Sequence, residues 1–112
     1  MKHNLPLPQD KKLTVLFRVE AGALGPEGDK HVDPFCVFAQ KELLSLDSDY
    51  VHWELVPRHD KSLPEMEYMV NGKKLSHDMA AKYLEVFEQD LDEFELHLAG
   101  NISQLVNEFM GH

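Results

Sequence analysis

The order of hydrophobic periodicities between residues 13 and 56 constrains the fold more than any other feature of the sequence. Residues 13–20 alternate apolar and polar side chains, as in a strand with one buried face. Apolar positions then recur at helical spacing over residues 35–46, and residues 50–56 alternate again. A strand–helix–strand crossover is parallel and right-handed in nearly all proteins. The sequence therefore predicts two parallel strands joined by a helix.

The signals at the ends of this first helix predict its boundaries. Residues 21–31 contain three glycines and read as a loop. Asp33 is a favourable N-cap residue, and Pro34 suits the first helical position because that position needs no backbone N–H. We therefore expect the helix to begin at Asp33–Pro34 and to end near Asp47.

A hairpin is expected after the second strand. Residues 65–70 again alternate, and Asn71–Gly72 follows them directly. Asn-Gly is a strong signal for a type I′ turn, which needs positive φ at both central positions. Residues 73–75 would then form a short returning strand, with two lysines that suit an exposed sheet edge.

The rest of the chain is expected to be helical. Ser76 is a good N-cap, and Gly100–Asn101 is expected to interrupt or end the helix that follows. The apolar residues between these points are spaced like a heptad seam: Ala80, Leu84, Phe87, Leu91, Phe94 and Leu98. Such a seam can pack against the chain's own sheet or against a second copy in a homodimer.

These elements predict an α+β fold of order β-α-β-β-β-α-α. Each strand has one apolar and one mixed face, whereas a sheet covered on both sides would show continuous apolar runs. We expect a two-layer sandwich with a mixed sheet and all helices on one face. A chain of 112 residues suits a single domain, here residues 13–112 with a helical, acidic part from 76 to 112. Residues 1–12, which carry two prolines, are expected to form a flexible arm.

Charge and cysteine content limit the classes of partner. The net charge is −9, and residues 83–112 contain seven acids and no lysine or arginine. Nucleic acids and anionic membranes attract basic surfaces, so neither is an expected partner. One cysteine and an N-terminus without an apolar run predict a cytoplasmic protein. The acidic helix can instead attract a basic protein partner, or simply be solvated. Its candidate patch consists of Glu85, Glu88, Asp92 and Glu95.

A second candidate surface lies on the mixed face of the strands and in the connection that follows them. This face is predicted to carry Tyr50, and the connection over residues 57–64 is rich in polar groups. The candidate residues for a ligand or partner surface are Arg18, His52, Glu54, Arg58 and His59. The alternative is a solvated loop beside a solvated sheet face.

Catalytic and metal-binding motifs are not apparent. Seven histidines are scattered without metal-ligand spacing, so neither a metal nor another cofactor is expected. Cys36 would lie in the first turn of the first helix, where the helix dipole lowers the pKa of a thiol. It is therefore a candidate reactive thiol, although free cysteines are more often buried structural residues.

Two stretches resemble parts of thioredoxin-like domains. Leu63–Pro64, the strand after it and the Asn71–Gly72 turn are similar to the end of such a domain, where a cis-proline precedes a strand, a tight turn and a closing helix. Residues 33–36 fall where that superfamily has its Cys-Pro-x-Cys motif, here with aspartate in place of the first cysteine. The element order is also similar to that of ferredoxin-like dimeric α+β barrels.

Three functions follow from these features. The first is a protein-interaction or regulatory module, with self-association as a homodimer among its modes. The second is a redox or thiol protein of thioredoxin-like ancestry centred on Cys36. The third is a binder of small ligands on the open face of the sheet.

Overall fold

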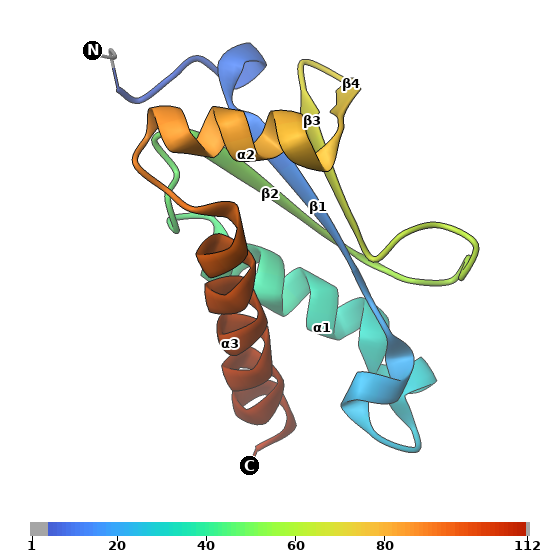
Figure 1. Cartoon of the computed structure of the whole chain (residues 1–112). Helices are drawn as coiled ribbons and strands as arrows, with labels where there is room; N and C mark the ends of the chain where they lie inside the picture. Colours follow the sequence, from blue (N-terminus) through green and yellow to red (C-terminus); the bar gives the residue numbers. More distant parts are fainter. Residues whose placement is uncertain (1–4, 112) are drawn as a thin grey trace.

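The computed structural model describes residues 5–111, in which three α-helices accompany one four-stranded sheet (Figure 1). The strand order is β2-β1-β3-β4, with β1 and β2 parallel and the other neighbours antiparallel. The predicted α+β class and element order are confirmed. The elements are β1 (Leu13–Val19), α1 (Gly28–Leu43), β2 (Val51–Pro57), β3 (Met66–Val70), β4 (Lys73–Leu75), α2 (His77–Val86) and α3 (Leu91–Met110), with short 3-10 helices at Gln9–Lys11 and Ala21–Leu24.

The three α-helices cover one face of the sheet, as predicted. Val15 lies in register between Trp53 of β2 and Tyr68 of β3, and all three side chains are buried beneath the helices. Side chains alternate along a strand, so Leu16 lies on the other face of the sheet. It is in register between Glu54 of β2 and the partly buried Glu67 of β3. That second face has no helix over it in the described part of the chain (Figure 1).

The hairpin and the cap of α2 form as the sequence predicts. Asn71 and Gly72 have φ of 52° and 78°, the two positive values that a type I′ turn requires. The Ser76 side chain accepts a hydrogen bond of 3.2 Å from the backbone N–H of Met79. Two features of the thioredoxin-like resemblance differ: the Leu63–Pro64 bond is trans, and the residue pair at 33–34 lies inside α1.

The predicted start of α1 was wrong. The helix begins at Gly28, five residues before Asp33, and Pro34 lies within it. Proline here removes one internal hydrogen bond of the helix. Gly28 permits the earlier start because the Ala21 carbonyl oxygen would lie only 1.7 Å from a Cβ added at Gly28. The 3-10 helix at Ala21–Leu24 therefore packs directly on the first turn of α1, where the sequence suggested a loop.

The predicted interruption at Gly100–Asn101 was also wrong, because α3 continues through both residues. The break lies earlier, where α2 ends and Glu88 has a φ of 61°. Asp90 then caps α3 by accepting a hydrogen bond of 3.1 Å from the N–H of Glu93. The positive φ at Glu88 and the cap at Asp90 both fit the local rules for helix ends. The regular spacing of the apolar seam, however, continues across the break and hides it in the sequence.

The apolar seam is buried within the chain's own core. Ala80 and Leu84 of α2 are fully buried, and Leu91, Phe94 and Leu98 of α3 are at most 5% exposed. The seam therefore lies on two helices that pack over the sheet. These side chains are not available as a dimer interface, so the seam no longer supports a homodimer. The open face of the sheet, the other surface considered for self-association, is not covered by a helix in the described part of the chain.

Tyr50 does not lie where the sequence predicted. Tyr50 lies just before β2, is buried on the helix side and stacks on Phe87 with ring centroids 4.4 Å apart. It was wrongly assigned to the mixed face.

Residues 1–4 of the predicted arm lie outside the described residues. Leu7, within that arm, packs against the core, and its N–H donates to the Asp49 carbonyl.

The edge of the sheet at β2 is covered by one side chain of α1. The Gln40 amide donates to the Trp53 carbonyl and accepts a 2.8 Å hydrogen bond from the N–H of Leu55. It thus occupies the position of a neighbouring strand's peptide group. Beside it, the Asp47 carbonyl accepts from the N–H of Val51, and Pro57 at the other end of β2 has no N–H to expose. Such coverage limits edge-to-edge association.

Candidate functional site

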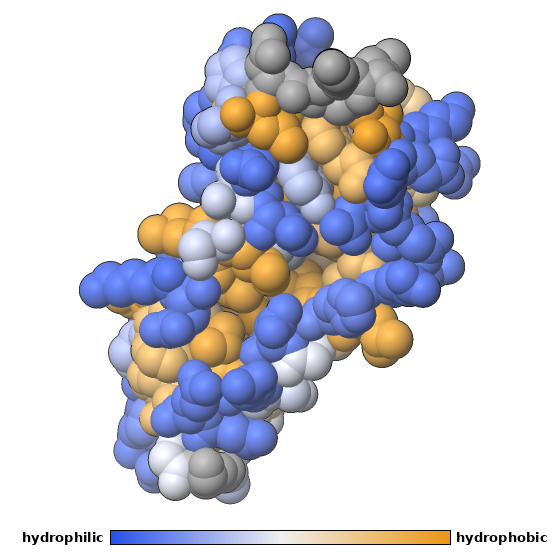
Figure 2. Space-filling model, turned by 90° about the vertical axis from the view of Figure 1, so that its left-hand side faces the viewer, coloured by the Kyte–Doolittle hydropathy of each residue, from blue (hydrophilic) through white to orange (hydrophobic). Residues whose placement is uncertain are grey.

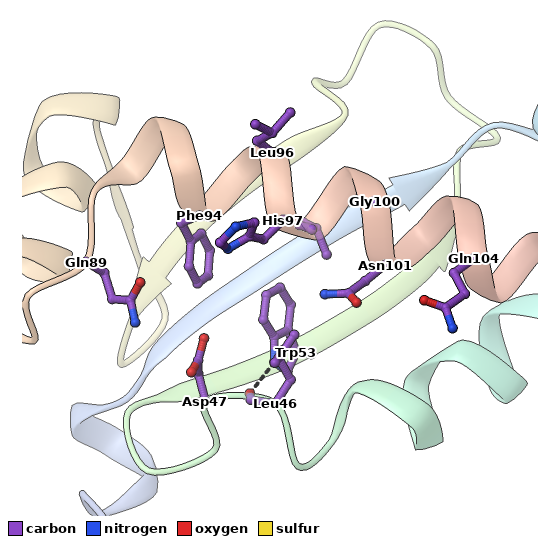
Figure 3. Close-up of a pocket in the computed structure, with 11 residues that line it drawn as sticks. Leu46, Asp47, Trp53, Gln89, Phe94, Leu96, His97, Gly100, Asn101 and Gln104 are labelled. Atoms are coloured by element: carbon purple, nitrogen blue, oxygen red, sulfur yellow. Dashed lines mark hydrogen bonds between the residues drawn. The ribbon is translucent and has the colours of Figure 1, made fainter.

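A groove runs along α3 on the side that faces the turn after α1. It consists of two adjoining hollows of about 610 and 380 Å3 that share Leu46, Asp47, Asn101 and Gln104 in their walls. We call it the α1–α3 groove; Figure 3 shows its larger hollow, with side chains of α3 projecting toward Asp47 and Leu46. On the molecular face shown in Figure 2, apolar side chains gather across the middle and hydrophilic ones border them.

The floor of the groove is a rigid aromatic pair. The Trp53 and Phe94 rings are stacked, with centroids 5.5 Å apart and planes only 8° from parallel. The Trp53 indole N–H donates a 2.7 Å hydrogen bond to the Leu46 carbonyl (Figure 3). Both rings are almost completely buried, so close packing holds them in place.

The wall formed by α3 is polar for a simple geometric reason. His97, Asn101, Gln104 and Glu108 recur at spacings of four, three and four, so they lie on one face of the helix. This face adjoins the buried stripe that contains Phe94. The apolar stripe of α3 therefore faces the core, and its polar stripe faces the groove.

The polar groups of the groove retain hydrogen-bonding capacity. The Gln89 amide donates to the Tyr50 hydroxyl over 2.9 Å, and Gln104 donates to Glu108 over 3.4 Å. Each of these amides still offers a carbonyl oxygen, and Asn101 projects into the hollow from α3 (Figure 3). An amide supplies both donors and acceptors, so this wall suits the backbone of a bound peptide.

The electrostatics of the groove are one-sided. Glu42, Asp47 and Glu108 line it, and neither hollow has a lysine or arginine among its described lining residues. Asp47 is fixed by a φ of 50° and by its carbonyl, which accepts from the N–H groups of Tyr50 and Val51. Carboxylates beside an apolar floor concentrate negative potential. The groove therefore favours a cationic occupant.

Two candidate residues of the second surface, Arg18 on the mixed face and Arg58 in the connection after β2, act within the fold. The Arg18 guanidinium donates to the Pro64 carbonyl over 2.7 Å and pairs with Glu67 over 3.2 Å. Arg58 pairs with Glu20 over 2.5 Å and donates to the Leu63 carbonyl. Together they hold the connection between β2 and β3 in place, so their charges are largely satisfied internally.

The other candidates of this surface are separated from the groove. His59 lines a smaller hollow of about 230 Å3 with Arg58 and Glu20, at the carboxyl ends of β1 and β2. His52 and Glu54 lie on the open face of the sheet, with 3.7 Å between the imidazole Nε2 and a carboxylate oxygen. The structure thus brings Arg58 and His59 together but leaves His52 and Glu54 apart from them.

The acidic patch is divided by the break between α2 and α3. Glu85 is near the end of α2, Glu88 lies in the link, and Asp92 is in the first turn of α3; all three are exposed. Glu95 instead accepts a hydrogen bond from the Tyr68 hydroxyl on the β3 side of the helix.

The lining of the α1–α3 groove was missed by the sequence analysis because its two walls are far apart in sequence. The polar stripe of α3 was the available signal.

Cys36 is a buried residue in the middle of α1. It is 4% exposed, and burial, with a smaller effect from Asp33, raises its pKa to about 11. The first-turn position that would allow the helix dipole to lower this pKa was wrong, because α1 begins eight residues before Cys36. Within the described residues, no group of three His, Cys, Asp or Glu side chains is arranged to hold a metal ion.

The raised pKa of Cys36 predicts slow modification. At pH 8 a thiol of pKa about 11 has about 100-fold less thiolate than one at the ordinary value of 9.0, and the thiolate is the reactive form. Native protein should react with a disulfide reagent at least 100-fold more slowly than the same chain in urea, which serves as the control. A native rate equal to the urea rate would contradict the burial of this thiol.

The raised pKa of Cys36 also makes the stability of the protein depend on pH. The unfolded thiol loses its proton at a lower pH than the folded one, so the contribution of Cys36 to stability is present below pH 9 and is lost as pH rises toward 11. A Cys36→Ala variant should lack that part of the alkaline decline, measured by urea unfolding at increasing pH.

Comparisons with known proteins add no functional information. No family model, curated protein or solved structure matches this chain. No helix in the described part of the chain is both long enough and apolar enough to cross a membrane.

Proposed function

We propose that this chain is a protein-interaction module, and that the α1–α3 groove binds a partner segment carrying lysine or arginine next to apolar side chains. One observation carries the proposal: three carboxylates and several amides surround an aromatic floor, with no lysine or arginine among the described lining residues. Opposite charge at the rim and an apolar centre are the usual basis of a specific protein contact.

The length of the groove supports a peptide over a small molecule. Its α3 wall runs from Phe94 to Glu108, and a rise of 1.5 Å per residue makes this about 21 Å. An extended peptide of about six or seven residues has the same length. The amides of Asn101 and Gln104 lie along this wall, and that of Gln89 lines the groove from the link before α3. All three can pair with peptide N–H and C=O groups.

A peptide selection tests this proposal directly. A displayed library of random short peptides is selected against the folded chain, and the affinity of single peptides is then measured by fluorescence polarisation. We expect the selected peptides to combine basic and apolar residues. Their dissociation constants should rise about tenfold or more between about 0.05 and 0.5 M salt, because exposed charge pairs are screened.

Two double variants with the same change in charge locate the binding surface. Glu42→Lys with Glu108→Lys reverses two groove carboxylates and should weaken binding at least tenfold. Glu85→Lys with Asp92→Lys reverses two exposed acids outside the groove lining and should leave affinity unchanged. Peptides that are acidic, binding that is independent of salt, or a loss confined to the second variant would each refute the proposal.

A further inference from the structure

Three titratable side chains from three different elements meet on the flank of α3 opposite the α1–α3 groove. The Tyr68 hydroxyl of β3 donates a 2.5 Å hydrogen bond to Oε2 of Glu95 on α3. The imidazole Nε2 of His77, at the start of α2, lies 3.5 Å from the same oxygen. Glu95 and Gln104, which lines the groove, lie on opposite faces of α3, because nine residues are two and a half turns of a helix. This Tyr68–Glu95–His77 cluster is therefore separate from the groove.

The cluster borders an apolar cavity. Leu63, Pro64, Met66 and Leu75 form the apolar wall of a hollow of about 340 Å3, and Tyr68 closes it from the sheet side. The polar part of its lining consists of Glu67, Lys74, His77 and Glu95. A second hollow of about 360 Å3, lined by further apolar residues of β1 and α3, adjoins it through Met66 and Glu95. The Glu95 carboxylate thus stands where the two hollows meet. Cavities of about 300 Å3 and more are the usual size for small-molecule sites.

Glu95 differs from the other carboxylate of this cavity in its partners. Glu67 pairs with Arg18 over 3.2 Å and with Lys74 over 3.5 Å, so its charge is neutralised within the fold. Across residues 5–111, no lysine or arginine nitrogen lies within 4 Å of the Glu95 carboxylate. Within the same residues, the one basic group inside that distance is the imidazole of His77, which is 61% exposed.

Tyr68 fixes the orientation of this carboxylate. Burial and the neighbouring Glu95 raise the pKa of Tyr68 well above its ordinary value, so the hydroxyl stays protonated and remains a donor. Oε2 of Glu95 is therefore occupied by the hydroxyl, and Oε1 is left to interact with an occupant of the cavity. A fixed carboxylate beside an apolar wall binds an ammonium group through a charge-assisted hydrogen bond.

We propose that this cavity is a binding site for a small organic amine, with the ammonium group on Glu95 and the apolar body between Met66 and Leu75. Charge complementarity selects the amine: the lining holds two carboxylates and one lysine ammonium group, and that ammonium, of Lys74, pairs with Glu67, so the charge of Glu95 is left for the ligand. The apolar walls select a ligand with a hydrocarbon body over a fully polar one. The proposal does not depend on the peptide-binding function of the groove, because the cavity between Met66 and Leu75 shares none of its described lining residues with the groove. Leu98 lines both the groove and the second hollow, but the proposed amine contacts do not involve it.

The test compares three probes that share one hydrocarbon chain. The isotope-labelled full-length chain is titrated at neutral pH with hexylamine, hexanol and hexanoate, and binding is followed by the NMR shifts of backbone amides. We expect saturable shifts at Tyr68, Leu75 and Glu95, with hexylamine bound at least tenfold more tightly than hexanol. Hexanoate should bind more weakly than either.

Matched glutamine variants separate this cavity from the groove. Glu95→Gln keeps an acceptor for the Tyr68 hydroxyl and removes the charge, so hexylamine affinity should fall at least tenfold, to that of hexanol. Glu108→Gln removes one charge from the α1–α3 groove and should leave hexylamine affinity unchanged. Absence of saturable shifts, equal affinity for hexylamine and hexanol, or a loss in Glu108→Gln without one in Glu95→Gln would each overturn the proposal.

Discussion

Replacing Gly28 with alanine should destabilise the protein by about 2 kcal/mol or more, because the new methyl group has no room. Its carbon would lie 1.7 Å from the backbone oxygen of Ala21 and 2.5 Å from the Ala21 carbonyl carbon. Both are backbone atoms, so relief requires the Ala21–Leu24 segment to move away from the first turn of α1. Leu24 is buried in the core, and such a movement would also loosen its packing.

Replacing Gly100 with alanine should instead increase the free energy of unfolding. A Cβ added there meets no atom within 4 Å, and the residue lies inside α3. Alanine should therefore stabilise the helix by about 0.5–1 kcal/mol through its better helix propensity. Both variants add one methyl group to a helix, so their difference in unfolding free energy reports the contact at Ala21. Urea unfolding followed by circular dichroism measures both. A Gly28→Ala variant as stable as the parent would show that the two segments do not touch.

Replacing Gln40 with alanine should have the second large effect. The change removes two hydrogen bonds to the edge of β2 and leaves the Trp53 carbonyl and the Leu55 N–H without their side-chain partner. Loss of two partly buried hydrogen bonds should cost about 2–3 kcal/mol of unfolding free energy. The uncovered edge should also promote association between molecules, because unpaired strand edges recruit further strands.

Two measurements separate these consequences for Gln40→Ala. Urea unfolding gives the loss of stability, and sedimentation velocity over a concentration series shows whether oligomers form. Lys41→Ala, an exposed change one residue along the same helix, is the control and should alter stability by less than about 0.5 kcal/mol. A Gln40→Ala variant with the stability and the sedimentation of that control would contradict the role assigned to this amide.

The strands and the hairpin were predictable because their signals are local. Alternation placed the first three strands to within one residue at each end, and Asn71–Gly72 located the turn. Ser76 likewise identified the start of α2. In each case neighbouring residues alone carry the physical cause, which is the period of two in a strand, the positive φ of the turn or the cap of a helix.

The two helix boundaries that the sequence prediction missed have different physical causes. Asp33–Pro34 is a good local start signal, but packing of Ala21–Leu24 on Gly28 extends α1 beyond it. The break at Glu88 was hidden because the apolar spacing of four and three residues continues from Phe87 to Leu91. Tertiary packing therefore overrode local preference at the start of α1. The break at Glu88 instead follows local signals, which the regular apolar spacing masked.

The candidate sites were harder to predict than the fold. Asp47 and Asn101 meet only because the turn after α1 lies against α3 (Figure 3). Nothing in the spacing of Tyr68, His77 and Glu95 shows that three elements converge on one oxygen atom. The prediction from sequence found the arginines instead, because clustered charge is visible along the chain. In the structure, Arg18 and Arg58 are occupied in holding a loop.

The position of β1 in the centre of the sheet has a consequence for how the chain assembles during synthesis. This strand leaves the ribosome first, yet both of its neighbours, β2 and β3, follow it in sequence. The apolar face of the sheet then remains uncovered until α2 and α3 emerge. A nascent chain that ends before residue 91 would expose the Trp53 ring that Phe94 later covers. Folding can therefore be completed only when the C-terminal helix is free, and an emerging chain depends until then on protection from aggregation.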